Sequence, residues 1–304
     1  MHLLAASVQA GSNPAGAAED AQLGAALDQS VELTLDVLAL ILHCGHGGLA
    51  PDVRSVCRAW RTAYDATVKH LRCDSESDLP FCCPNLRGYS IHPRPPHGVS
   101  AAAAQRALHA LAEGPSPLTS LGLALIDDLT ELPPAVLALG ATLTRICIHH
   151  CPNFTMLPAV GLAQLAHLEA LSLEGCKLLQ LPECIASALP RLRELAVPGN
   201  LLTELPPLPG SLEHLNLSYN RIKQLDAAAL SRLTALTALS AVAAFSHRPH
   251  GESSPIVGAL ARLQAQHLVH GSRLLLNIDS DVGELVHPRA RRLAEAAERQ
   301  GVII

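Results

Sequence analysis

The sequence has few aromatic residues, no excess of positive charge and no long apolar run. Phenylalanine, tryptophan and tyrosine make up 2% of the 304 residues, so leucine and alanine supply most of the apolar side chains for a core. The net charge of −5 argues against a nucleic-acid binder, because such a protein needs a basic surface to neutralise phosphates. The absence of a run of roughly eighteen uninterrupted apolar residues argues against a membrane span.

Paired cysteines and a targeting signal are also missing. The nine cysteines are spread without paired spacing, and no basic segment followed by an apolar one opens the chain. This pattern favours a reducing compartment, so we expect a cytoplasmic or nuclear protein. Residues 1–30 are rich in alanine and glycine and contain no lysine or arginine, which predicts a flexible tail rather than an organellar transit peptide.

Leucines recur with a fixed spacing in the middle of the chain. The clearest copies are LTRICIHHCPNF (143–154), LEALSLEGCKLL (168–179), LRELAVPGNLL (192–202) and LEHLNLSYNRI (212–222). LTSLGLALIDDL (118–129) fits the same template, and this number of copies resembles the leucine-rich repeat. The resemblance implies an α/β solenoid, a curved parallel sheet with short helices or extended segments returning on its convex side.

The connections between the copies differ in length and composition. Residues 160–168 and 183–192 have room for a short helix on the way back. LTELPPLPGS (202–211) is rich in proline, which lacks an N–H and disfavours the α region for its predecessor, so this return is predicted to be extended. We expect complete repeats over 118–245, with a junction and a weaker, irregular repeat in 73–117.

One position in each copy follows the strand and turns inward. Cysteine or asparagine occupies it at Cys151, Cys176, Asn200 and Asn220, and Ile126 takes the place in the first copy. Buried backbone groups need partners at such a turn. Asparagine can supply them fully, whereas cysteine is a weaker and more apolar substitute.

The non-leucine positions of the copies predict a polar concave face. Mixed charge with several histidines is typical of a surface that binds a protein or peptide through hydrogen bonds and ion pairs. A solvated strand face is polar even without a partner, so a purely structural role is the alternative for each residue. The candidate substrate-binding residues are Arg145, His149, His150, Glu169, Glu174, Arg193, Glu194, Glu213, His214, Asn216 and Tyr219.

A metal site is the other chemistry that the repeats suggest. Cys147, His149, His150 and Cys151 lie within five consecutive positions and include typical zinc ligands. Cys151 occupies the inward turn, however, and no second pair of ligands completes a tetrahedral set. We therefore expect neither a metal nor another cofactor.

The C-terminal part departs from the repeat. IVGALARLQAQHL (256–268) is predicted to be a helix, SRLLLNID (272–279) a strand and HPRARRLAEAAERQG (287–301) a second helix. The last slice of a repeat sheet needs a cover against association of its edge, so residues 255–304 are interpreted as a C-terminal cap.

Residues 31–72 precede the repeats and have helical periodicity. One helix is predicted from about Thr34 to Gly45, and a second begins near Pro51. LTLDVLALI (33–41) and VCRAWR (56–61) together resemble an F-box, although Thr34 replaces the proline of that family. The order of an F-box followed by leucine-rich repeats is itself a known architecture.

The F-box resemblance implies a function and a docking surface. It implies a small all-α head that docks on a Skp1-type linker of a cullin-RING ubiquitin ligase, while the repeats hold a protein substrate and the chain itself performs no catalysis. The residues implied in linker binding form apolar stripes on the two helices. They are Leu33, Val37, Leu38, Ile41, Leu42, Val53, Val56, Cys57 and Trp60.

Two alternatives compete with this interpretation. The two helices can be merely an N-terminal cap of a scaffold that has no link to ubiquitin. An enzyme is the other, because LPPLPGSLEHLNLSYN (205–220) is similar to the repeats of bacterial ubiquitin-ligase effectors. Those proteins carry a large catalytic domain after their repeats, whereas the roughly 60 residues that follow here contain no cysteine nucleophile.

Overall fold

The computed structural model describes residues 69–74, 85–93, 98–114, 117–246 and 254–300. The chain divides into two units, Met1–Val68 and Lys69–Ile304, and all described residues belong to the second. The predicted tail, the F-box-like motifs and the proposed linker-binding residues lie outside the described residues. The head predicted for residues 31–72 therefore stays a prediction. The end of that range extends into the first strand of the second unit, which begins at His70.

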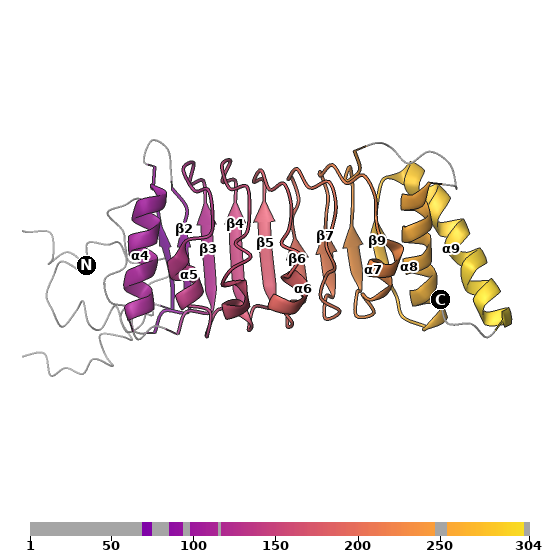
Figure 1. Ribbon diagram of the computed structural model, residues 1–304, viewed down its shortest axis with the longest axis horizontal. Coiled ribbons are helices and arrows are strands. Elements are labelled where there is room, and N and C mark those ends of the chain that lie inside the picture. Colours follow the sequence, from indigo (N-terminus) through magenta and orange to yellow (C-terminus); the bar gives the residue numbers. More distant parts are fainter. Residues whose placement is uncertain (1–68, 75–84, 94–97, 115–116, 247–253, 301–304) are drawn as a thin grey trace, which may run out of the picture. The chain divides into compact units, whose positions relative to one another are not determined.

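A parallel sheet runs through this second unit, and its nine described strands follow chain order. Figure 1 shows them side by side, with the helix α4 near the first strands and α8 and α9 after the last. Each strand pairs only with its neighbours in the sequence, as a repeat fold requires. The strands are β1 (His70–Cys73), β2 (Gly88–Ile91), β3 (Ser120–Ala124), β4 (Arg145–His149), β5 (Ala170–Glu174), β6 (Glu194–Ala196), β7 (His214–Asn216), β8 (Ala238–Ser240) and β9 (Leu275–Asn277).

Alternation along each strand places the core on one side of the sheet. In β4, Ile146 and Ile148 are buried, whereas Arg145 is exposed and His149 is half-buried. The leucine that starts each copy also enters the core, as Leu168 does with no exposed surface. Fully burying one such side chain contributes roughly 1.5–3 kcal/mol to stability. Because each repeat buries similar leucines, the repeats stabilise the fold to a similar extent.

The return segments follow the sequence prediction. The predicted helices in 160–168 and 183–192 are single turns, the 3₁₀ helix η3 (Leu162–Leu165) and α6 (Ile185–Ala188). Residues 201–209, with their three prolines, form no helix, as expected for an extended return. Two further short helices lie in other returns, α5 (Pro134–Ala138) and α7 (Ala227–Ser231).

A longer helix that the sequence interpretation missed lies between β2 and β3. It is α4 (Ala101–Glu113), and its first turn is capped by Ser100, whose hydroxyl accepts a hydrogen bond from the Ala103 N–H at 3.2 Å. Its buried side consists mainly of alanines together with Leu108 and Leu111. Few large apolar residues mark this stripe in the sequence, which explains why residues 73–117 read only as a junction.

The C-terminal part has the predicted helix–strand–helix order. Helix α8 (Pro255–Val269) precedes β9, which extends the sheet, and α9 (Ser280–Gln300) follows it. The second helix was predicted to begin at His287, but it begins seven residues earlier and continues through Pro288. Proline removes one backbone donor, and the burial of Val286 before it and of Ala290 after it holds the helix together on both sides.

No helix in the described part of the chain is both long enough and apolar enough to cross a membrane.

A buried histidine in α8 makes the stability of this C-terminal part sensitive to pH. His267 is 3% exposed, and its Nδ1 lies 2.8 Å from the Ser272 hydroxyl. Burial lowers the pKa of His267 from its usual 6.5. The unfolded chain therefore binds this proton at a higher pH than the folded chain, so the stabilisation is full above about pH 6.5 and is lost as the pH falls below it.

We expect the urea concentration at the midpoint of unfolding to decrease when the pH is lowered from 7.5 to 5.5. The decrease should be smaller in the variant His267→Gln, whose side chain cannot be protonated in this range. His214→Gln, at an exposed position on β7, is the control for the removal of a histidine elsewhere, and its midpoint should decrease more than that of His267→Gln. Circular dichroism at a series of urea concentrations measures both. Identical pH dependence in His267→Gln and the wild type would contradict the assignment.

Candidate functional site

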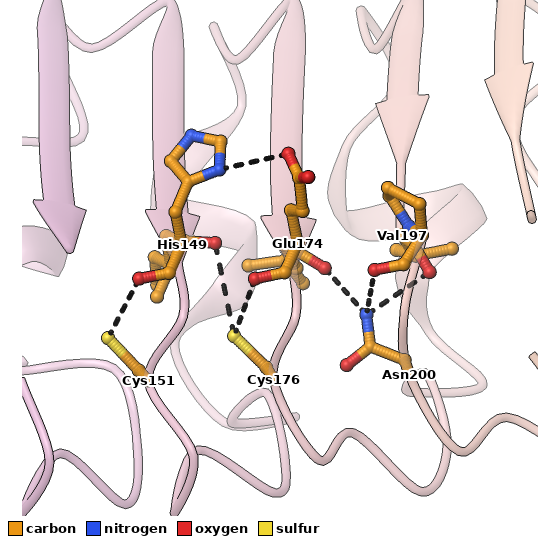
Figure 2. Close-up of polar contacts among 9 residues, drawn as sticks. His149, Cys151, Glu174, Cys176, Val197 and Asn200 are labelled. Atoms are coloured by element: carbon orange, nitrogen blue, oxygen red, sulfur yellow. Dashed lines mark hydrogen bonds and ion pairs between the residues drawn. The ribbon is translucent and has the colours of Figure 1, made fainter. Parts of the chain in front are cut away.

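The strands that carry the candidate face are held by a row of buried side chains at the inward turns (Figure 2). Asn200 is 4% exposed and donates from Nδ2 to the carbonyl of Leu173 at 2.6 Å and to that of Val197 at 3.1 Å. Its Oδ1 accepts a hydrogen bond from the Leu178 N–H at 3.0 Å. The side chain thus joins its own repeat to the preceding one.

Asn220 repeats this arrangement one copy later. Its Nδ2 donates to the carbonyls of Val197 and Leu217, both at 2.8 Å, and its Oδ1 accepts from the Leu202 N–H at 3.1 Å. Each asparagine therefore satisfies backbone groups on two repeats at once. A buried polar group without a partner costs about 1–3 kcal/mol, which explains why this residue type suits the position.

The two cysteines at the same position make fewer and weaker contacts. The thiol of Cys151 lies 3.6 Å from the carbonyl oxygen of His149, and that of Cys176 lies 3.5 Å from the carbonyl oxygen of Glu174 and 3.9 Å from that of Ile148. Burial raises the pKa of Cys151 to about 11 and also raises the pKa of Cys176. These thiols remain protonated near neutral pH, so they act as weak donors and not as nucleophiles.

A second row forms where the chain leaves each strand. Successive copies place a residue with positive φ here, and its N–H donates to a carbonyl of the next repeat. These residues are Leu125, His150, Gly175, Gly199, Tyr219 and Ala243. After the last of them no further repeat of this kind follows, and the Ala243 N–H instead lies 3.2 Å from a carboxylate oxygen of Asp279. Asp279 thus ends the row.

The candidate substrate-binding residues fall into three groups. Six of them lie on the exposed side of the strands, namely Arg145, His149, Glu174, Glu194, His214 and Asn216. The other five lie outside the strands, whereas the sequence predicted one common face for all of them. Glu169, Arg193 and Glu213 come directly before β5, β6 and β7, and His150 and Tyr219 belong to the row with positive φ.

The alternation of strand side chains explains this difference. Arg193 and Glu194 are neighbours in sequence and cannot both point outward from one strand. Instead the carbonyl of Arg193 accepts hydrogen bonds from the N–H groups of Glu213 and His214 as the next strand begins. The exposed side chains of Arg193 and Glu213 pair with each other at 3.2 Å.

The register of the sheet aligns the outward residues in rows. One row runs from Ser120 through Arg145, Ala170, Glu194 and His214 to Ala238. Another contains His149 and Glu174, whose Nδ1 and carboxylate oxygen lie 3.4 Å apart (Figure 2). Cys147 lies between these rows, and burial is the main reason that its pKa is raised.

Two open depressions lie on the outward side of the sheet. The larger has a volume of about 390 Å³ over β1 to β4, and the smaller about 380 Å³ over β6 to β9. The larger one includes His70, Arg72 and His92, which the sequence interpretation did not include in the face. The only sequence signal for them was the weak repeat around Leu86, and none marked β1.

The suspected zinc ligands do not gather around one point. His149 faces Glu174, while Cys151 is buried on the other side of the chain and contacts a carbonyl. Within the residues that the structure describes, no group of three or more histidine, cysteine, aspartate or glutamate side chains has a metal-binding arrangement.

Comparison with known proteins identifies the repeats. Residues 190–243, which contain β6 to β8, match the family model of the leucine rich repeat. Among solved structures 101 chains are similar, including a leucine-rich-repeat protein of Leptospira interrogans with 23% identity and a TM-score of 0.45. That alignment covers 58% of this chain and 43% of the other, so this chain spans less than half of that protein. No curated protein matches the sequence.

The chain therefore contains leucine-rich repeats, and its second unit is a solenoid with a parallel sheet and short helices. This confirms the repeat prediction. The comparisons detect no F-box, so that part of the interpretation stays a prediction.

Replacing a buried asparagine tests how strongly the row holds the repeats together. Asn200→Ala leaves the Leu173 carbonyl and the Leu178 N–H without their partner, whereas the Val197 carbonyl still accepts from Asn220, so we expect a loss of about 3 kcal/mol in the free energy of unfolding. Cys176→Ala is the matched variant in the preceding copy and should cost only about 1 kcal/mol, because the thiol bonds are long. Urea unfolding measures both, and equal losses would show that hydrogen bonding does not distinguish the two positions.

Proposed function

We propose that this chain is a non-catalytic protein-interaction solenoid that holds a partner protein on the outward side of its sheet. The observation that supports this most is the exposed, polar and aligned set of side chains on consecutive strands, together with two open depressions among them. Such surfaces bind proteins through complementary charge and hydrogen bonds. The buried thiols with raised pKa favour a binding role over nucleophilic catalysis.

We further propose that the solenoid selects substrates for a cullin-RING ubiquitin ligase in the cytoplasm or nucleus. The support is the F-box-like sequence VCRAWR (56–61) located shortly before the first strand of the repeats. In this proposal the apolar residues of segment 33–60 dock on a Skp1-type linker. The sheet then presents the bound substrate, and no nucleic acid, membrane or cofactor takes part.

The second candidate is a scaffold without a link to ubiquitin. It is favoured by the sheet itself, because the first strand of a repeat sheet needs a cover for its edge. The two amphipathic helices predicted within residues 31–72 would serve that purpose alone. In this case the chain would bind its partner without docking on a ligase.

Capture of a purified Skp1-type linker by the immobilised full chain separates the two candidates. We expect capture by the wild type and a loss of at least tenfold in the double variant Leu38→Ala and Trp60→Ala, because truncating central apolar anchors removes most of the binding energy. Arg145→Glu, on the sheet, is the control and should bind the linker like the wild type. Capture that survives the double variant contradicts linker docking through these residues, and no capture by any form favours the scaffold.

A further inference from the structure

The outward side of the sheet is basic over its first strands and mainly acidic over its middle strands. Exposed lysine and arginine residues lie on or directly before β1 to β4, at Lys69, Arg72, Arg87 and Arg145. Acidic residues predominate at the equivalent places on β5 to β7, at Glu169, Glu174, Glu194 and Glu213, and the basic Arg193 before β6 is paired with Glu213. The chain as a whole carries a charge of −5, so the basic end is a local feature.

The larger depression lies at this basic end because the side chains of its floor are small. Ser90, Ser120, Gly122 and Ala124 face outward on β2 and β3, whereas the neighbouring β4 carries the larger Arg145, Cys147 and His149 at the positions aligned with those of β3. A Cβ atom added at Gly122 would lie 3.0 Å from the Cβ of Ser90 on the neighbouring strand, so glycine keeps this part of the floor free of a side chain. The hollow is open to a ligand from outside.

Hydrogen-bond donors surround the floor. The guanidinium of Arg72 donates to Nδ1 of His92 at 2.9 Å, which places the proton of a neutral His92 on Nε2. Asp74 neutralises Arg72 at 2.9 Å, but no carboxylate lies within ion-pairing distance of Arg145 among the described residues. The hollow thus offers an N–H donor at His92, and Arg145, which is aligned with the lining residue Ser120 on the next strand, adds a cation beside it.

We propose that the hollow over β1 to β4 binds an extended acidic segment of the partner protein. Aspartate or glutamate carboxylates of that segment pair with Arg145 and accept from His92, while its backbone crosses the small residues around Gly122. Adjacent strands are about 4.8 Å apart, so crossing four of them takes about 14 Å, or roughly four extended residues. This proposal rests on the interaction role proposed above and specifies the chemistry of the partner.

The residues of the second depression explain why an acidic segment prefers the first one. A segment of the same charge placed over β6 to β9 meets Glu194, which lines that depression, and like charges brought together in this way are repelled. An acidic segment therefore binds more tightly in the hollow over β1 to β4. The distribution of charge, more than the shape of the sheet, sets which part of the face is used.

Selection of displayed random dodecapeptides on the immobilised full chain tests this inference. We expect the selected peptides to be enriched in aspartate and glutamate. One selected peptide is then synthesised, and its affinity is measured by fluorescence anisotropy. Affinity should fall at least tenfold in Arg145→Glu, which reverses the charge at the hollow, and in Ser120→Phe, which fills it.

Matched variants control for net charge and for bulk. Arg221→Glu changes the net charge equally, but at an exposed position directly after the Asn220 turn. Ala238→Phe adds a ring in the same row of the sheet as Ser120, but on β8. Both should bind the peptide within twofold of the wild type, and circular dichroism checks that all four variants fold.

Three outcomes overturn the proposal: selection of no peptide, selection of peptides without acidic enrichment, or equal losses in the test and control variants. Capture of the Skp1-type linker is measured on the same preparations. It depends on residues 33–60, so failure of linker docking leaves the peptide result unchanged, and failure of the peptide test leaves linker docking unchanged.

Discussion

The structure depends on one constraint, which is that the backbone groups buried at each inward turn must find hydrogen-bond partners. The turn after every strand brings N–H and carbonyl groups into an apolar interior. Asn200 and Asn220 satisfy these groups on two consecutive repeats, and so they tie the copies together as well as closing each turn. In these two copies the link adds to the register that strand pairing sets along the whole sheet.

The way in which these backbone groups are satisfied changes from one repeat to the next. Asparagine occupies the turn in the two copies that start at 192 and 212, cysteine does so in the two before them, and Ile126 takes the place in the copy that starts at 118. At the other end of the row with positive φ, the Asp279 carboxylate accepts from the Ala243 N–H in place of a further carbonyl. The C-terminal part thus completes the polar interactions of the repeats in addition to covering their apolar core.

Much of the solenoid could be predicted because its leucine spacing is local and nearly unbroken. The strands of the copies at 143 and 168, the buried turns and the proline-rich extended return all follow from single residues and their neighbours. Helix α4 could not be recognised, since its buried side is mostly alanine and gives a weak apolar signal. The early start of α9 was missed because Pro288 resembles a helix start, whereas burial on both sides of it decides the outcome.

The candidate face was predicted in part for a related reason. A repeat template identifies which residues are not leucine, but it does not separate those on the strand from those just before or after it. Glu169 and Tyr219 fall outside the strand for this reason. The basic end of the face was missed because β1 and β2 carry imperfect copies. There, pairing with the next strand decides which residues face outward, and the leucine pattern is too weak to reveal it.

Hydrogen–deuterium exchange of the full chain, resolved by residue, tests the central role of the buried turns most directly. The N–H groups of Leu178 and Leu202 bond only to the side chains of Asn200 and Asn220 in the contacts described above. The account predicts that both exchange as slowly as the N–H groups at the centres of β5 and β7, with the free energy of global unfolding. Exchange at these two positions that is much faster than in the strands would show that the asparagine links open independently, and would contradict the account.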